Sequence, residues 1–158
     1  MTVYNHFGSK GGLVEALSDE LAVRGGIGRL PEAFRAPDAR AGLRRLVEVF
    51  VGFWDREQVA IRRLRALSAI DPELEHGNRD QRRRQAISSL AQRLASESGG
   101  QDTAALDRLV DCVWVLTSFD SFEQLSSTDR SADQVVELIW SGVEALLDSI
   151  ASEQRQVP

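Results

Sequence analysis

The sequence predicts an all-α protein, built as a helical bundle. Apolar residues recur three and four positions apart along most of the chain, which is the spacing of one helix face. No stretch alternates apolar and polar residues for long, and no Asn-Gly or Asp-Gly pair marks a hairpin turn. Glycines, prolines and capping residues divide the chain into segments of helical length, so we expect about six helices and a helical fragment at the start.

The first half of the chain contains a long helix-forming pattern with one clear interruption. Leucines four residues apart favour a helix over Ser9–Arg24, and the glycines that follow are a stop signal. Pro31 and Pro37 then bound a loop. Residues 43–54 have a strongly amphipathic pattern, and a shorter helix is expected over 61–67.

Capping signals locate the next two helices. Asp71 followed by Pro72 is typical of a helix start, and the Gly-Gly pair at 99–100 ends that helix. Asp102 is expected to cap another helix, whose apolar residues run through Trp114 and on toward Leu125.

The last two predicted helices carry more apolar residues than one buried face needs. The final helix opens with a capping box of Ser131 and Gln134, and its apolar residues form two stripes. Because a surface helix needs only one apolar face, both helices are either buried inside one bundle or packed against a partner. Their position at the end of a small chain favours a homodimer through residues 105–126 and 132–150. The expected interface residues are Phe119, Phe122, Val136, Trp140, Val143 and Leu147.

Charge is unevenly distributed along the chain. Of 158 residues, 19 are basic and 24 acidic, which gives a net charge of −5. Residues 1–100 hold 16 basic and 13 acidic side chains, a net +3, whereas residues 101–158 hold 3 and 11, a net −8. A negative chain does not fit a protein whose main surface grips nucleic acid, and the segregation predicts different partners for the two ends.

The composition also indicates the setting of the protein. A chain of this length can bury one core, and its 42% hydrophobic content excludes a disordered chain. The only cysteine, Cys112, lies in an apolar helical run, where a buried and unreactive thiol is expected. Because no signal peptide or membrane span is recognisable, we expect a cytoplasmic protein without membrane association.

Aromatic residues on two predicted helices indicate a ligand pocket between them. Small-molecule sites are mostly apolar with a few polar groups, although a plain packed core is the alternative for each aromatic residue. The residues expected to line this pocket are Phe50, Phe53, Trp54, Leu67, Leu90, Val110, Trp114 and Thr117.

Two arginine clusters, at 62–65 and 82–84, are candidates to select an anionic ligand. We interpret most of these arginines as a solvated face or as partners of nearby carboxylates. No catalytic constellation, metal-ligand spacing or phosphate-binding glycine loop is recognisable, so no enzyme activity, metal or cofactor is expected.

The most specific pattern is the segment TVYNHFGSKGGLVEALSDEL at residues 2–21. Thr2, Tyr4 and His6 carry groups that can reach DNA phosphates or base edges. Ser9 can cap the following helix, whose N-terminus attracts an anion, and Lys10 adds a positive charge there. This segment resembles the end of the DNA-binding domain of TetR-family transcriptional regulators, where a recognition helix, a short turn and a linking helix follow one another.

The resemblance covers residues 2–21 by motif and the rest of the chain by pattern and order. It implies a remnant of the helix-turn-helix domain at residues 1–24 and a TetR-type effector-binding and dimerisation domain at 38–152. It further implies a regulator, with repression expected, whose core binds a small apolar or amphipathic effector. The residues that it places against DNA are Thr2, Tyr4, Asn5, His6 and Lys10.

The family places two further helices before the recognition helix, to hold that helix in the major groove. We expect the chain as given to begin inside the recognition helix, and to bind operator DNA specifically only if those helices are present. The alternative is a dimeric, all-helical module that binds small molecules without DNA. A helical enzyme is a third class, for which no set of reactive residues is recognisable.

Overall fold

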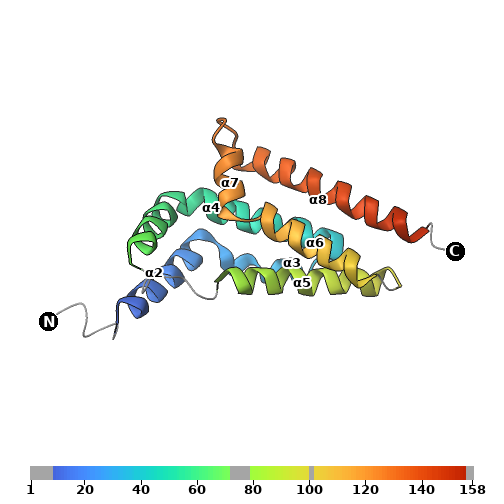
Figure 1. The fold of residues 1–158 in the computed structure, drawn as a ribbon, viewed down its shortest axis with the longest axis horizontal. Coiled ribbons are helices and arrows are strands. Elements are labelled where there is room, and N and C mark those ends of the chain that lie inside the picture. The colour runs from blue at the N-terminus through green and yellow to red at the C-terminus, as the bar shows by residue number, and fades with distance from the viewer. Residues whose placement is uncertain (1–8, 72–78, 100–101, 156–158) are drawn as a thin grey trace.

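The computed structural model describes residues 9–71, 79–99 and 102–155, which are helical almost throughout (Figure 1). No strand occurs in these ranges, so the predicted all-α class is confirmed. The elements are α2 (Lys10–Gly25), the 3-10 turn η1 (Ile27–Arg29), α3 (Pro31–Phe34), α4 (Ala39–Ile70), α5 (Arg79–Glu97), α6 (Thr103–Leu116), α7 (Phe119–Ser126) and α8 (Ala132–Arg155).

Several helix boundaries lie where the sequence predicts them. The Ser9 hydroxyl accepts a backbone N–H at the start of α2, and Gly26, with a φ of 90°, ends that helix. The Asp102 carboxylate accepts a backbone N–H at the start of α6. The capping box of Ser131 and Gln134 is confirmed, because each side chain accepts the other residue's backbone N–H, at 3.3 and 2.9 Å.

Other boundaries differ from the prediction. One continuous α4 of 32 residues replaces the two helices expected over 43–54 and 61–67, because the intervening residues contain neither glycine nor proline. The helix expected to run through Trp114 toward Leu125 is instead two helices, since Ser118 caps a separate α7. Pro31 begins the short α3 inside the expected loop. Asp71 follows the end of α4, and residues 72–78 lie outside the described ranges.

The main hydrophobic core lies between α4, α5, α6 and α8. Each fully buried large side chain there contributes about 1.5–3 kcal/mol relative to exposure. A smaller cluster of Leu21, Phe53 and Leu64 packs α2 against the middle and the end of α4. The largest fully buried side chains of the main core include Phe122, Leu43, Leu46, Ile87, Leu90, Leu109, Ile139 and Ile150.

The long helix α4 connects the two ends of the molecule. It packs against α2, α3, α5, α7 and α8. In Figure 1, α2 lies at one end of the long axis and the C-terminal end of α8 at the other. On α4, the residues that pack against α2 include Phe53, near its middle, and Leu64, near its end.

The segregated charges meet within the folded chain. Arg40 on α4 pairs with Glu144 and Asp148 on α8, at 2.8 and 3.1 Å. Exposed pairs of this kind contribute at most about 1 kcal/mol each. The basic first segment and the acidic last segment of the chain therefore pair with each other. The sequence had instead predicted a different partner for each end. Further pairs between the two segments are Arg44–Glu137, Arg62–Glu123, Arg65–Asp120 and Arg84–Asp111.

The prediction of a buried Cys112 was wrong, because this residue is exposed. The buried face of α6 carries Leu109, Val110 and Val113, and Cys112 falls beside it. Among the helices of the described residues, none is long and apolar enough to cross a membrane.

Candidate ligand-binding pocket

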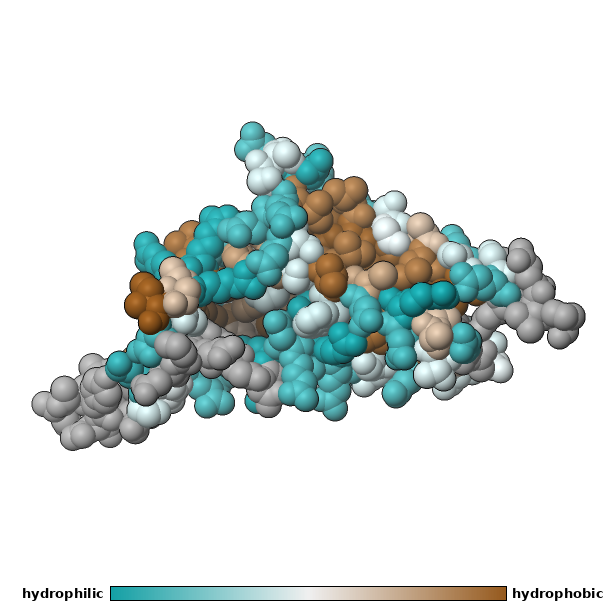
Figure 2. Space-filling view, in the orientation of Figure 1, coloured by the Kyte–Doolittle hydropathy of each residue, from teal (hydrophilic) through white to brown (hydrophobic). Residues whose placement is uncertain are grey.

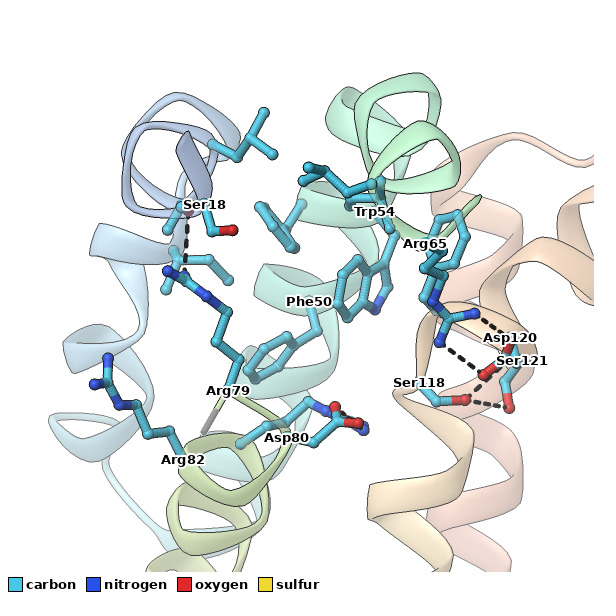
Figure 3. A pocket seen from close by; sticks show the side chains of 18 of the residues that line it. Ser18, Phe50, Trp54, Arg65, Arg79, Asp80, Arg82, Ser118, Asp120 and Ser121 are labelled. Carbon is cyan, nitrogen blue, oxygen red and sulfur yellow. Dashed lines mark hydrogen bonds and ion pairs between the residues drawn. The ribbon is translucent and has the colours of Figure 1, made fainter. Parts of the chain in front are cut away.

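A pocket of about 770 Å³ lies between α2, residues 50–65 of α4, the start of α5, the end of α6, and α7 (Figure 3). Small-molecule sites range over roughly 300–1,000 Å³, so this pocket has the size of a ligand site. Its lining is mostly apolar, with charged side chains from α2, α4, α5 and α7.

Aromatic side chains form one wall of the pocket. Phe50, Phe53 and Trp54 share one face of α4 because they are three and four positions apart. The ring of Trp54 lies 4.7 Å from that of Phe53 and 5.5 Å from that of Phe119 on α7, measured between centroids. The indole Nε1 of Trp54 donates to the backbone carbonyl of Thr117 at 2.9 Å. These contacts fix the orientation of the wall.

Arg83 on α5 is the most deeply buried charged side chain in the pocket lining, with 4% exposure. Its Nη1 donates to Thr117 Oγ1 at 2.9 Å and to the Trp114 carbonyl, and its Nη2 donates to Asp80 at 3.1 Å. The guanidinium carbon lies 5.9 Å from the Phe50 ring centroid and 5.6 Å from that of Trp114. Burial lowers the pKa of Arg83, because the charged form loses its water, while Asp80 opposes this shift.

An ion pair between helices lies next to the aromatic wall. Arg65 on α4 donates to both carboxylate oxygens of Asp120 on α7 (Figure 3). These hydrogen bonds hold the pKa of Asp120 below its usual value. The Arg65 guanidinium also lies over the Phe119 ring, 5.0 Å from its centroid. Nearby, Ser118 donates to Ser121 at 3.1 Å.

Two arginines attach α2 to the rest of the pocket wall. Arg79 at the start of α5 donates to the backbone carbonyls of Glu15 and Ser18 at 3.2 Å, and to Asp19 at 2.9 Å. Arg24 near the end of α2 forms a two-point hydrogen bond with Glu57 on α4, whose carboxylate is almost fully buried. The pocket therefore shares one wall with a helix that α4 and α5 hold from two sides.

The structure brings together four of the eight predicted pocket residues. Phe50, Phe53, Trp54 and Trp114 line the pocket. Thr117 lies behind the lining, where it contacts Arg83 and Trp54. Leu90 and Val110 instead belong to the hydrophobic core, and Leu67 is 53% exposed. Helical spacing identifies an apolar face, but it does not distinguish the part of that face that borders a cavity.

The arginine clusters divide between solvent and pocket. Arg62 pairs with Glu123 and Arg84 with Asp111, as the interpretation of a charged, paired face predicts. Arg83 is the exception that this interpretation missed. Its position four residues before Ile87 places it on the apolar stripe of α5, and this spacing was the available signal.

The six residues predicted at a dimer interface have a different place in the structure. All are buried within the same chain, with exposures of 8% or less, and Phe119 also lines the pocket. For these side chains the alternative explanation of the excess apolar residues holds, because α4 and α6 cover them from within the bundle. The set is Phe119, Phe122, Val136, Trp140, Val143 and Leu147.

Most of the predicted DNA contacts lie outside the described residues, namely Thr2, Tyr4, Asn5 and His6. Lys10 is described at the start of α2, where its ammonium group pairs with Asp71 at 3.1 Å. Within the described ranges, no three His, Cys, Asp or Glu side chains gather as metal ligands would.

The fold and the pocket define an all-α protein with a ligand-sized site between its helices. Comparisons of the chain with protein-family models, with curated proteins and with solved structures found no match.

Proposed function

We propose that the protein is a TetR-type transcriptional regulator, acting as a repressor, whose pocket binds a small effector. The motif at residues 2–21 supports this class of protein. The pocket supports the effector, because it has the size and the mostly apolar lining of a small-molecule site.

One observation carries the proposal furthest: α2 forms part of the pocket wall. Ser18, Asp19, Leu21 and Ala22 on α2 all line the pocket. The resemblance assigns this same helix the task of linking the DNA-binding domain to the effector domain. A ligand in the pocket would therefore contact the linking helix directly.

The mechanism follows from that contact. An effector shifts an equilibrium only if it binds one position of α2 more tightly than the other. Arg79 and Arg24 hold α2 at two points, and only Arg79 lines the pocket. A ligand that displaces the Arg79 contact would therefore change the tilt of the helix. In a dimer, such a tilt changes the separation of two recognition helices, which must match half-sites roughly 34–36 Å apart.

A homodimer belongs to the proposal, and the exposed face of α6 and α8 is the surface available to it. Figure 2 shows apolar side chains gathered where α6, α7 and α8 meet. Val115 on α6 is 54% exposed and Leu138 on α8 is 44% exposed. Gly142 and Ala145, which are also exposed, follow Leu138 at helical spacing and would permit close approach of a second helix.

Operator binding is proposed for a chain that carries a complete helix-turn-helix before α2. The test is to read the codons upstream of Met1 and to assay the extended chain by gel shift against operator candidates. An in-frame helix-turn-helix and a sequence-specific shift that a pocket ligand relieves are the expected results. An in-frame stop directly upstream would contradict DNA binding, and would favour the alternative of a dimeric small-molecule-binding module.

A further inference from the structure

Two buried N–H groups on one wall of the pocket have no acceptor in the described part of the chain. They are Nε of Arg83 and Nε1 of Trp114. Both residues line the pocket, and the Arg83 guanidinium carbon lies 5.6 Å from the Trp114 ring centroid. Buried donors are nearly always paired in folded proteins, so two unpaired donors on contacting residues of the lining indicate an acceptor that the described chain does not supply.

The charges around the pocket favour an anionic acceptor. Four arginines and three aspartates line the described part of the wall, which leaves one positive charge in excess. Arg65 and Arg79 each form a short ion pair. The one ion pair of Arg83 is with Asp80, whose side chain is 73% exposed. Arg82 forms no ion pair with a described residue. A ligand with one negative charge would neutralise the excess positive charge of the pocket lining.

The rest of the wall sets the chemistry of the remainder of the ligand. Phe50, Trp54 and Phe119 present aromatic surface beside Arg83, and Leu21 and Leu64 continue it toward α2. Removing apolar surface from water favours a ligand with a hydrocarbon or aromatic body. A doubly charged phosphate or a purely polar anion would leave this surface without a partner.

We propose that the pocket binds an amphipathic carboxylate, whose acidic group accepts from Arg83 Nε and Trp114 Nε1 and whose apolar body lies against the α4 aromatic wall. This inference rests on the proposed role of the pocket as an effector site, and it names the chemical class of that effector. Protein atoms cover both nitrogens, so the indole and the guanidinium must turn toward the cavity when the carboxylate binds.

The test compares decanoate with decanol, which has the same chain length but no charge. Both are titrated into the purified protein by calorimetry at pH 8, below the micelle concentration of decanoate. We expect decanoate to bind at least about tenfold more tightly than decanol, because a charge-assisted hydrogen bond contributes that much. Circular dichroism before and after the titration verifies that decanoate does not unfold the protein.

Variants separate the two donors from general apolar binding. Arg83→Met should weaken decanoate binding by about 10–100-fold, and Trp114→Phe by about tenfold, while decanol binding changes little. The control is Arg108→Met, which removes an exposed arginine on α6 that pairs with Glu153 outside the pocket, and it should leave decanoate binding within about twofold. If Arg83→Met fails to fold, Trp114→Phe and the comparison of decanoate with decanol still test whether the pocket binds a carboxylate.

Equal affinities for decanoate and decanol would overturn the carboxylate inference and leave the apolar pocket as an effector site. The same holds if Arg83→Met and Arg108→Met have equal effects on decanoate. Failure of both ligands to bind the unmodified protein would overturn the inference and also count against the pocket as an effector site.

Discussion

At the scale of single residues, Thr117 holds two parts of the pocket wall together. Its side chain is fully buried, and Oγ1 donates to the Val113 carbonyl at 2.7 Å while it accepts from Arg83 at 2.9 Å. Its own carbonyl accepts from the Trp54 indole. One threonine behind the lining thus positions both a buried cation and an aromatic ring.

Thr117→Val should destabilise the protein. Valine keeps the shape of the side chain but removes one acceptor of a buried guanidinium, so we expect a loss of about 1–3 kcal/mol in the free energy of unfolding. Urea unfolding followed by circular dichroism measures this loss. The matched control is Thr103→Val at the exposed start of α6, which should change stability by less than about 0.5 kcal/mol. Equal effects of the two substitutions would contradict the assigned role.

The residues of the pocket are predictable from sequence only where their type is distinctive. Phe50, Phe53 and Trp54 are recognisable because three aromatic residues share a helix face. Arg83 is harder to recognise, because two other arginines flank it and only its spacing from Ile87 distinguishes it in the sequence. The packing of α5 against α6 buries it and leaves Arg82 exposed. Sequence spacing alone placed Leu90 in the pocket, whereas packing places it in the core.

At the scale of elements, the contact of α2 with α4 depends on a glycine. A Cβ added to Gly25 would lie 2.3 Å from Cδ2 of Phe53, whose ring lines the pocket. The absence of a side chain therefore allows the end of α2 to approach the aromatic wall.

Gly25→Ala should weaken this contact and reduce the free energy of unfolding by about 1–3 kcal/mol, as overpacking does. Gly28→Ala is the matched control, because a Cβ there meets nothing within 4 Å, and it should be neutral or stabilise by about 0.4–1 kcal/mol. Thermal and urea unfolding of both variants give the comparison. A Gly25→Ala variant as stable as the Gly28→Ala variant would show that α2 does not pack as described.

The ion pair of Glu57 with Arg24 makes the same contact dependent on pH. The hydrogen bond from Arg24 lowers the pKa of Glu57, despite its burial. A carboxyl group whose pKa is lower in the folded than in the unfolded chain stabilises the folded protein. This stabilisation is fully present above the unfolded-state pKa of about 4.3, and it is lost as the pH falls through the folded-state pKa.

Glu57→Gln should therefore reduce stability at pH 7, and its difference from the unmodified protein should shrink as the pH falls below about 4. Urea midpoints measured from pH 7 to pH 3 test this difference, with Glu15→Gln on the exposed side of α2 as the control. A difference that stays constant over this range would contradict the ion pair.

Element boundaries are predictable where a capping residue marks them. Ser9, Asp102 and Ser131 identify the starts of α2, α6 and α8 by their side-chain chemistry. The sequence predicted two helices where the structure has the single helix α4. The apolar face of α4 packs into the main core near Leu46 and borders the pocket near Trp54, so the apolar pattern shifts along the helix. A shift of the apolar stripe within one helix looks in sequence like the end of a helix.

At the scale of the whole molecule, burial changes which substitutions can test a dimer. Trp140 is 6% exposed and belongs to the core, whereas Leu138 on the same helix is 44% exposed. A charged residue at position 140 would destabilise the fold, whereas a charged residue at position 138 would disrupt only a contact with another molecule.

Leu138→Glu should give a monomer with an unchanged circular dichroism spectrum. Trp140→Glu should lose at least about 3 kcal/mol of stability, because it removes a large buried side chain and buries a carboxylate. Sedimentation velocity at micromolar concentration measures the oligomeric state of both variants and of the unmodified protein. A monomeric unmodified protein, or a dimeric Leu138→Glu variant, would remove the exposed face of α6 and α8 from the proposal.

The most direct test of the central claim is whether a ligand in the pocket moves α2. Spin labels at Val23→Cys on α2 and Ser149→Cys on α8, in a Cys112→Ser background diluted with unlabelled chain, report the distance between the two helices by pulsed electron paramagnetic resonance. Saturation with decanoate should shift this distance by about 1–2 Å or more, the scale of helix movements in switching proteins. A protein saturated by calorimetry with an unchanged distance distribution would contradict the claim.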